Sequence, residues 1–275
     1  MAKSVFSKRG AVLRPMKSTQ SIIRATAMRL KPIYTDIIDE VISKTINYAK
    51  AQESLRVKEA DFSRPDISKI VDDHAEDIEA VLLPNATNAA RFTVNSVLSA
   101  FASKYSAEFF NKAVRPVIAN RIFKIVTTEI TASIEQSLKE KFNTAIQDGW
   151  SLDKLEKNLS ELKGNYATIA RTEILSASSQ AERIQTSHEI AQLGVAARTI
   201  KEWHISGSGK ERDSHIDASI KYGPGSGIPY ADDFIINRPT GGTEAAFAPM
   251  DARLSAGNFI NCQCHMVVRV MPLEI

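Results

Sequence analysis

Apolar residues recur at spacings of three and four positions along most of the first 193 residues, which is the period of an amphipathic helix. The pattern predicts six helices, over residues 18–56, 66–83, 89–114, 116–147, 151–163 and 166–193. Pro84 and Asn85 are expected to separate two of them, and Gly149 and Gly194 to end two others. Ser151 is expected to cap the short fifth helix. The apolar stripes of such helices most simply bury one another in a bundle.

The pattern changes after Gly194. It predicts a strand over 197–206, a short helix over 210–220, a strand over 230–237, an irregular stretch over 238–258 and a final strand over 259–270. We therefore expect an α+β protein, in which a long-helix N-terminal region precedes a small mixed α/β C-terminal domain with an antiparallel sheet. The expected divisions are a basic arm at 1–31, a helical region at 32–165 and the C-terminal domain at 166–275.

Charge is unevenly placed, although the net charge of the chain is only +3. Residues 1–31 contain no Asp or Glu, and their basic residues are Lys3, Lys8, Arg9, Arg14, Lys17, Arg24, Arg29 and Lys31. Such an arm attracts anionic surfaces such as nucleic acid, acidic lipid or an acidic protein. A solvated terminus and a mitochondrial transit peptide are the alternatives. The sequence shows no secretory signal and no apolar run of about 20 residues, so no membrane span is expected.

Cys262 and Cys264 are the two cysteines of the chain. Their close spacing disfavours a disulfide between them. On a strand, positions i and i+2 would place both thiols on one face. The pair could then supply half of a tetrahedral zinc site, with His204 or His215 as a further ligand. The alternative is two small apolar side chains packed in a core strand.

Arg212 and His215 are spaced to lie on one face of a short helix. Together with His204 they could form the acid, the base and the phosphate contact of a metal-independent nuclease. The alternative is a hydrogen-bonded structural network that ties helix to sheet, with Glu173 and Asn261 as partners. The sequence favours the structural network.

The stretch from Gly207 to Lys210 has part of the pattern of a phosphate loop but lacks two of its requirements. His204 stands where the motif needs Gly, and Glu211 stands where it needs Ser or Thr. Nucleotide binding through this loop is therefore excluded.

Short motifs over about residues 150–270 appear in the order and spacing of one known family. They are Ala170-Arg171-Thr172-Glu173, Gly194, Lys201-Glu202-Trp203, Arg212-Asp213-Ser214-His215 and Asn261-Cys262-Gln263-Cys264. In this order they resemble the phage head morphogenesis family, the Mu F-like minor head proteins of tailed bacteriophages. Gln263 replaces the usual Arg of the last motif, and the acidic residue that often precedes the Arg-x-x-His segment is absent or supplied by Glu211.

The resemblance implies a minor capsid protein at the portal vertex, present in few copies, that acts in head assembly, DNA packaging or DNA ejection. It implies the portal protein, the major capsid protein and packaged double-stranded DNA as partners. The expected location is the virion, and the host cytoplasm during assembly. In that setting the basic arm would contact DNA phosphates without regard to sequence. The motif residues are expected to be mainly structural, without catalysis.

Overall fold

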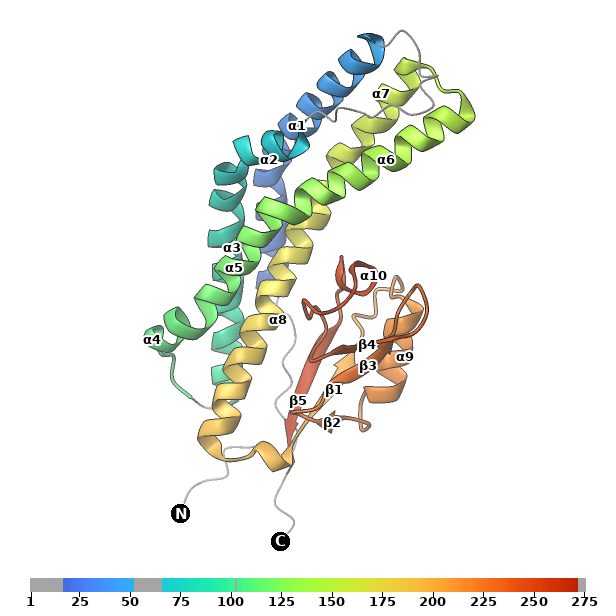
Figure 1. The fold of residues 1–275 in the computed structure, drawn as a ribbon. Helices are drawn as coiled ribbons and strands as arrows, with labels where there is room; N and C mark the ends of the chain where they lie inside the picture. Colours follow the sequence, from blue (N-terminus) through green and yellow to red (C-terminus); the bar gives the residue numbers. More distant parts are fainter. Residues whose placement is uncertain (1–16, 52–65, 102, 272–275) are drawn as a thin grey trace, which may run out of the picture. The chain divides into compact units, whose positions relative to one another are not determined.

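The computed structural model describes residues 17–51, 66–101 and 103–271, and it is an α+β protein with long helices and small antiparallel sheets near the C-terminus (Figure 1). The α-helices are α1 Lys17–Ala51, α2 Ile67–Asp73, α3 Ala75–Ala100, α4 Ala107–Phe109, α5 Arg115–Lys124, α6 Ile130–Asp148, α7 Leu152–Ser160, α8 Tyr166–Leu193, α9 Asp213–Tyr222 and α10 Ala256–Phe259. Two π-helical segments, Phe110–Val114 and Ile125–Glu129, join α4, α5 and α6 into one continuous helical run. Two 3-10 segments are Glu161–Asn165 and Ala196–Arg198.

The described residues form two compact units. The helical unit comprises residues 24–51, 66–84 and 119–170, and the sheet-bearing unit comprises residues 17–23, 85–101, 103–118 and 171–271. The division therefore falls within α1, α3, α5 and α8. Residues 85–101 and 103–118, which the predicted divisions placed in the helical region, belong to the same unit as the small sheets.

The helical unit is held by apolar stripes at helical spacing. Fully or almost fully buried residues on its helices include Ile37, Ile38, Val41, Ile70, Val71, Ile134, Leu155 and Leu159. The side chain of Ser151 accepts a hydrogen bond from the backbone of Lys154, which confirms the predicted cap of α7. An ion pair of 2.5 Å between Lys163 and Asp39 adds a polar contact at the surface of this unit.

Two predicted helix breaks are wrong. Pro84 lies inside α3, and the break falls instead at His74, the C-cap of α2. Ile78, Leu82 and Ala86 are all buried around Pro84, so the apolar stripe continues past the missing N–H group. The break expected between residues 114 and 116 is also absent, because the helical run from Ala107 passes through Pro116.

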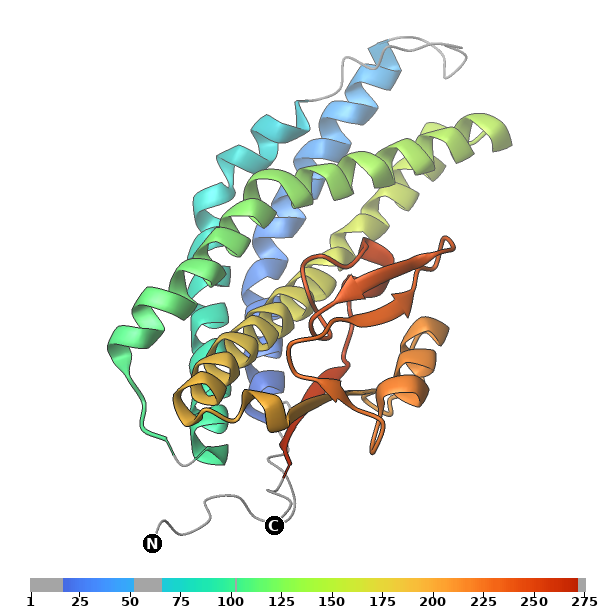
Figure 2. The same ribbon diagram turned by 60° about the horizontal axis from the view of Figure 1, so that its bottom comes forward.

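The sheets lie in the C-terminal part of the chain (Figures 1 and 2). The strands are β1 Thr199–His204, β2 Ile228–Pro229, β3 Phe234–Asn237, β4 Thr243–Ala246 and β5 His265–Val270. One antiparallel sheet has the order β2-β1-β5, with His204 opposite His265, and β3 pairs with β4 in the other. The stretch 238–258, expected to be irregular, therefore contains a strand. The last strand begins at His265 rather than at residue 259, where the short helix α10 stands instead.

Trp203 belongs to one apolar core cluster of the sheet-bearing unit. Its side chain is fully buried and packs edge-on against Phe234 and His215. α9 packs against β1 and β3, and its buried face contributes Ala218 and Tyr222 to the same apolar cluster. This packing fixes the start of α9, and with it His215, beside the turn that leads into β5.

Part of the predicted basic arm is helical, because α1 begins at Lys17. Lys3, Lys8, Arg9 and Arg14 lie outside the described residues. Arg24, Arg29 and Lys31 are exposed on α1. Among the described helices, none combines the length and the apolar character that a membrane crossing needs.

Candidate metal centre before the last strand

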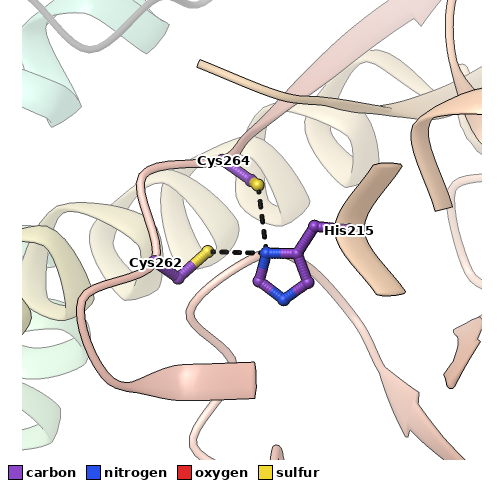
Figure 3. Close-up of side chains that lie close together, drawn as sticks. All are labelled: His215, Cys262 and Cys264. Carbon is purple, nitrogen blue, oxygen red and sulfur yellow. Dashed lines mark hydrogen bonds between the residues drawn. The ribbon is translucent and has the colours of Figure 1, made fainter. Parts of the chain in front are cut away.

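His215, Cys262 and Cys264 meet in the interior of the sheet-bearing unit (Figure 3). His215 Nδ1 lies 3.3 Å from Cys264 Sγ and 3.7 Å from Cys262 Sγ. The three donor atoms lie within 4.8 Å of one another, and all three residues are buried. Within the described ranges, this is the group of His, Cys, Asp and Glu side chains with the spacing to hold a metal ion. The sequence predicted these three residues as possible zinc ligands, and the fold places their donor atoms close to one another.

The two thiols converge through a turn and not through a strand. Both cysteines precede β5, and the pair follows Asn261, whose φ of 59° lies in the left-handed region. The backbone N–H of Cys262 donates to the carbonyl of Phe259 at 3.3 Å, which closes the turn after α10. The predicted strand geometry of the cysteines is therefore wrong, although their convergence is observed.

This turn is held to the beginning of two helices. The backbone N–H of Asn261 donates to Thr172 Oγ1 at 3.0 Å, and Arg171 Nη1 donates to Asn261 Oδ1 at 2.8 Å. Arg212, the N-cap residue of α9, donates from Nη2 to the carbonyl of Ile260 at 2.5 Å. Three motifs that are far apart in the sequence thus meet at one turn, and Glu173 is buried beside them on α8. Asn261, a predicted member of the structural network, forms its hydrogen bonds with Arg171 and Thr172.

The thiols differ in their tendency to ionise. A hydrogen bond from the Cys264 thiol, together with one from His215, holds the pKa of Cys262 well below its usual range against the effect of burial. The same thiol pair and burial raise the pKa of Cys264. Cys262 is therefore the thiol of the pair that ionises more readily, and it lies next to the imidazole of His215. Thiolate and neutral imidazole are the forms that bind a metal cation.

The remaining predicted catalytic residue, His204, does not join this group. It follows Trp203 on β1, so its side chain points to the opposite face of the strand. There its Nε2 lies 2.9 Å from Glu202 Oε2, and its ring centroid lies 5.5 Å from that of His265. His204 and His215 consequently do not face one phosphodiester, and His215 is only 1% exposed.

Glu202 and Lys201 are buried charged groups whose environments the sequence pattern did not reveal. Burial raises the pKa of Glu202, but hydrogen bonds from Arg269, His204 and the backbone of Gly225 outweigh it and lower the pKa. The ammonium of Lys201 donates to the carbonyl of Phe247 at 2.7 Å and lies 3.3 Å from the centroid of the Phe247 ring. Burial lowers the pKa of Lys201 to about 7.

The sequence pattern also did not reveal a charged cluster that joins the predicted strand at 230–237 to the stretch expected to be irregular. Arg253 binds Asp233 through two hydrogen bonds of 2.8 and 2.9 Å, and it binds Asp251 at 2.7 Å. These carboxylates are near enough to Lys201 to favour its charged form. No local motif signals the cluster, because Asp233 and Arg253 are 20 positions apart.

Comparison with known proteins identifies one curated relative of distant similarity. The protein YqbB of Bacillus subtilis (strain 168), described as uncharacterized, is 30% identical over 149 residues. The aligned part is 52% of this chain and 42% of YqbB, so the chain spans less than half the length of that relative. No family model and no solved structure matches the chain.

Proposed function

We propose that this chain is a minor head protein of a tailed bacteriophage, associated with the portal vertex and acting in head assembly, DNA packaging or DNA ejection. Its partners would be the portal protein, the major capsid protein and packaged double-stranded DNA. It would reside in the virion, and in the host cytoplasm during assembly. The proposal rests first on the ordered set of short motifs that resembles the Mu F-like family.

The observation that carries the proposal is the convergence of those motifs. Arg171 and Thr172 bind Asn261, Arg212 binds the carbonyl next to it, and His215 contacts both cysteines that follow. Residues that match a pattern by chance have no reason to contact one another across 90 positions. Their mutual contacts support reading them as one structural signature.

We further propose that His215, Cys262 and Cys264 bind a zinc ion. Zinc bonds of about 2.3 Å to sulfur and about 2.0 Å to nitrogen, at tetrahedral angles, separate the two donor atoms by about 3.5 Å. The observed separations of 3.3 and 3.7 Å lie on either side of this value. Zinc would displace the thiol proton of Cys264, so that two thiolates and one imidazole would bind it, and the ion would tie α9 to the turn before β5. Three protein ligands leave the fourth position to water or to another donor.

No observation favours the alternative of a nuclease that uses His215, His204 and Arg212. A general base must reach the proton that it removes, and His215 is enclosed. The geometry is that of a structural network, which agrees with a role in assembly and not in cleavage of phosphodiesters.

The test is the copy number of this chain in purified, DNA-filled particles, measured by quantitative mass spectrometry against the portal and major capsid proteins. A few copies per particle, retained after washing and lost from particles that lack the portal, would support the proposal. Absence of the chain from the particles would overturn it. A copy number close to that of the major capsid protein would overturn the assignment to the portal vertex.

A further inference from the structure

A polar hollow of about 550 Å³ opens beside the turn that carries Asn261, and half of the residues that line it are basic. The residues around it are Arg171, Ser208, Lys210, Arg212, Asn261 and Gln263. They come from the start of α8, the loop between β1 and α9, and the turn before β5. The lining therefore combines three cationic side chains with three neutral polar ones, and it includes no carboxylate.

The three cations of the hollow are available to a ligand. None of them forms an ion pair within the described part of the chain. Arg171 and Arg212 each donate one guanidinium N–H group to a neutral oxygen, of Asn261 and Ile260 respectively. Those contacts orient the two guanidinium groups and leave further N–H donors on each. Lys210 is exposed, so it brings its charge to the rim of the hollow.

The carboxylate that follows Lys210 in the sequence is held within the loop. Glu211 Oε1 accepts hydrogen bonds from Ser206 Oγ at 2.7 Å and from the backbone and side chain of Ser208 at 2.6 and 3.1 Å. These bonds lower the pKa of Glu211 to about 2, with the Ser206 hydroxyl as the largest cause. Gly207 and Gly209 take the positive φ of 73° that lets the loop fold around this carboxylate. Glu211 therefore shapes the loop that presents Lys210.

We propose that this hollow binds phosphate groups, and specifically those of a nucleic-acid backbone. Guanidinium groups form paired hydrogen bonds with phosphate oxygens, and Lys, Ser, Asn and Gln are the other side chains that contact nucleic-acid phosphates. The hollow holds each of these types. The choice of nucleic acid as the source of the phosphate rests on the proposed function. The binding of phosphate rests on the residues of the hollow alone.

The site is distinct from the predicted arm at residues 1–31, since its residues lie between positions 171 and 263. It is also distinct from the buried metal centre. Gln263 lines the hollow, while its neighbours Cys262 and Cys264 turn toward His215 (Figure 3). Neighbouring residues of the same turn thus line the hollow and the buried metal centre.

Lys210→Glu in the full-length chain tests the inference, with Lys221→Glu as the matched control. Lys221 is exposed at the other end of α9, about 13 Å along the helix axis from its start, and its replacement changes the net charge equally. Binding of a labelled DNA duplex is measured by fluorescence anisotropy over a range of salt concentrations. Binding of pyrophosphate is measured by calorimetry, and circular dichroism verifies that both variants are folded.

We expect Lys210→Glu to weaken duplex binding at least about fivefold more than Lys221→Glu, and to reduce the slope of log K against log salt by about one. That result would establish a nucleic-acid backbone as the ligand. Equal duplex binding by the two variants, with pyrophosphate bound by the wild type and lost in Lys210→Glu, would keep the phosphate site but assign it to free phosphates. Equal behaviour of both variants toward both ligands would overturn the inference. The particle measurement is separate, so its failure would be distinguishable from failure of this site.

Discussion

Arg171 donates a hydrogen bond from Nη1 to Asn261 Oδ1 at 2.8 Å, and the two residues lie 90 positions apart in the chain. Asn261 itself has a φ of 59°, in a region that Asn tolerates better than most residues with a side chain. Its backbone N–H is satisfied by Thr172. The side chain of Asn261 and its backbone conformation therefore make separable contributions to the stability of the turn.

The first prediction separates those contributions by comparing Asn261→Gly with Asn261→Ala. Both variants lose the bond to Arg171, which should cost about 1 kcal/mol of the free energy of unfolding. Asn261→Ala should cost about 1 kcal/mol more, because a left-handed φ strains alanine and not glycine. Urea unfolding followed by the fluorescence of Trp203, in a background that carries Trp150→Phe, reports on the sheet-bearing unit alone.

Asn261→Asp is the matched control for this comparison. It keeps an oxygen acceptor for Arg171 and the tolerance of a left-handed backbone, so its stability should lie within about 0.5 kcal/mol of the wild type. Equal losses in Asn261→Gly and Asn261→Ala would show that the backbone conformation contributes nothing.

The second prediction concerns the metal. Purified protein should contain one zinc ion per chain, and replacement by Co²⁺ should produce thiolate-to-cobalt charge-transfer absorption, because both proposed anionic ligands are thiolates. Cys262→Ser and Cys264→Ser should each lower the affinity for Co²⁺ by at least about tenfold. Metal analysis of the purified chain and a cobalt titration provide the measurements.

His204→Ala serves as the control in the cobalt titration, because His204 lies on the opposite face of β1 and binds Glu202. It should leave cobalt binding unchanged, whereas His215→Ala should weaken it. A folded wild-type protein that is free of metal, and whose unfolding midpoint does not respond to added Zn²⁺, would contradict the zinc proposal.

Much of the fold follows from local signals. α8 has the predicted bounds, and Gly149 and Gly194 both adopt a positive φ at the ends of helices, because glycine has no Cβ to oppose that conformation. Pro84 misled the prediction, since burial of the neighbouring residues on α3 outweighs its local cost of about 3 kcal/mol in a helix. The rule that proline ends a helix considers only the local sequence, so it takes no account of burial by residues that are distant in the chain.

The candidate metal centre was predictable in its residues but not in its geometry. The spacing of Cys262 and Cys264 suggested a shared face, which the fold produces through the left-handed turn at Asn261. The hollow that contains Arg171 and Lys210 was not foreseen, because its members are distributed over the chain and no local pattern joins them. Only the packing of α8 and α9 on the same turn brings them together.

The third prediction uses a buried carboxyl group on α8. Glu182 lines a small cavity of about 60 Å³, and its Oε1 atom has no hydrogen-bond partner among the described residues. Burial raises the pKa of Glu182 to about 8 from its ordinary value of 4.5. The unfolded chain therefore loses this proton at a lower pH than the folded chain. As a result, the carboxyl group lowers stability increasingly as pH rises from 4.5 toward 8.

Glu182→Gln should remove that loss while keeping the size of the side chain. Between pH 5 and pH 7.5 its free energy of unfolding should rise relative to the wild type by at most about 3 kcal/mol. The exposed Glu108→Gln, on α4 of the same unit, should show no such change. Urea unfolding at the two pH values measures the difference, and parallel behaviour of Glu182→Gln and the wild type would refute the prediction.

The fourth prediction concerns Lys201, whose side chain is fully buried on β1 against the rings of Phe247 and Phe234. Burial lowers its pKa from 10.5 to about 7, so above pH 7 the unfolded chain holds a proton that the folded chain has released. This difference lowers stability, and the loss shrinks as pH rises toward 10.5. From this group alone, the free energy of unfolding should increase by about 2 kcal/mol between pH 7 and pH 9.

Lys201→Met isolates that contribution, since it keeps the length of the side chain without a titrating group. The variant loses the hydrogen bond to the carbonyl of Phe247, yet it no longer buries an amine. Its stability should therefore lack the increase of about 2 kcal/mol that Lys201 contributes to the wild type between pH 7 and pH 9. The exposed Lys221→Met corrects for the other groups that titrate in this range, because it should follow the wild type. If Lys201→Met showed the full increase, the increase would not come from Lys201. The ammonium group of Lys201 in the wild type would then have its ordinary pKa, and water would have to reach it between the aromatic rings.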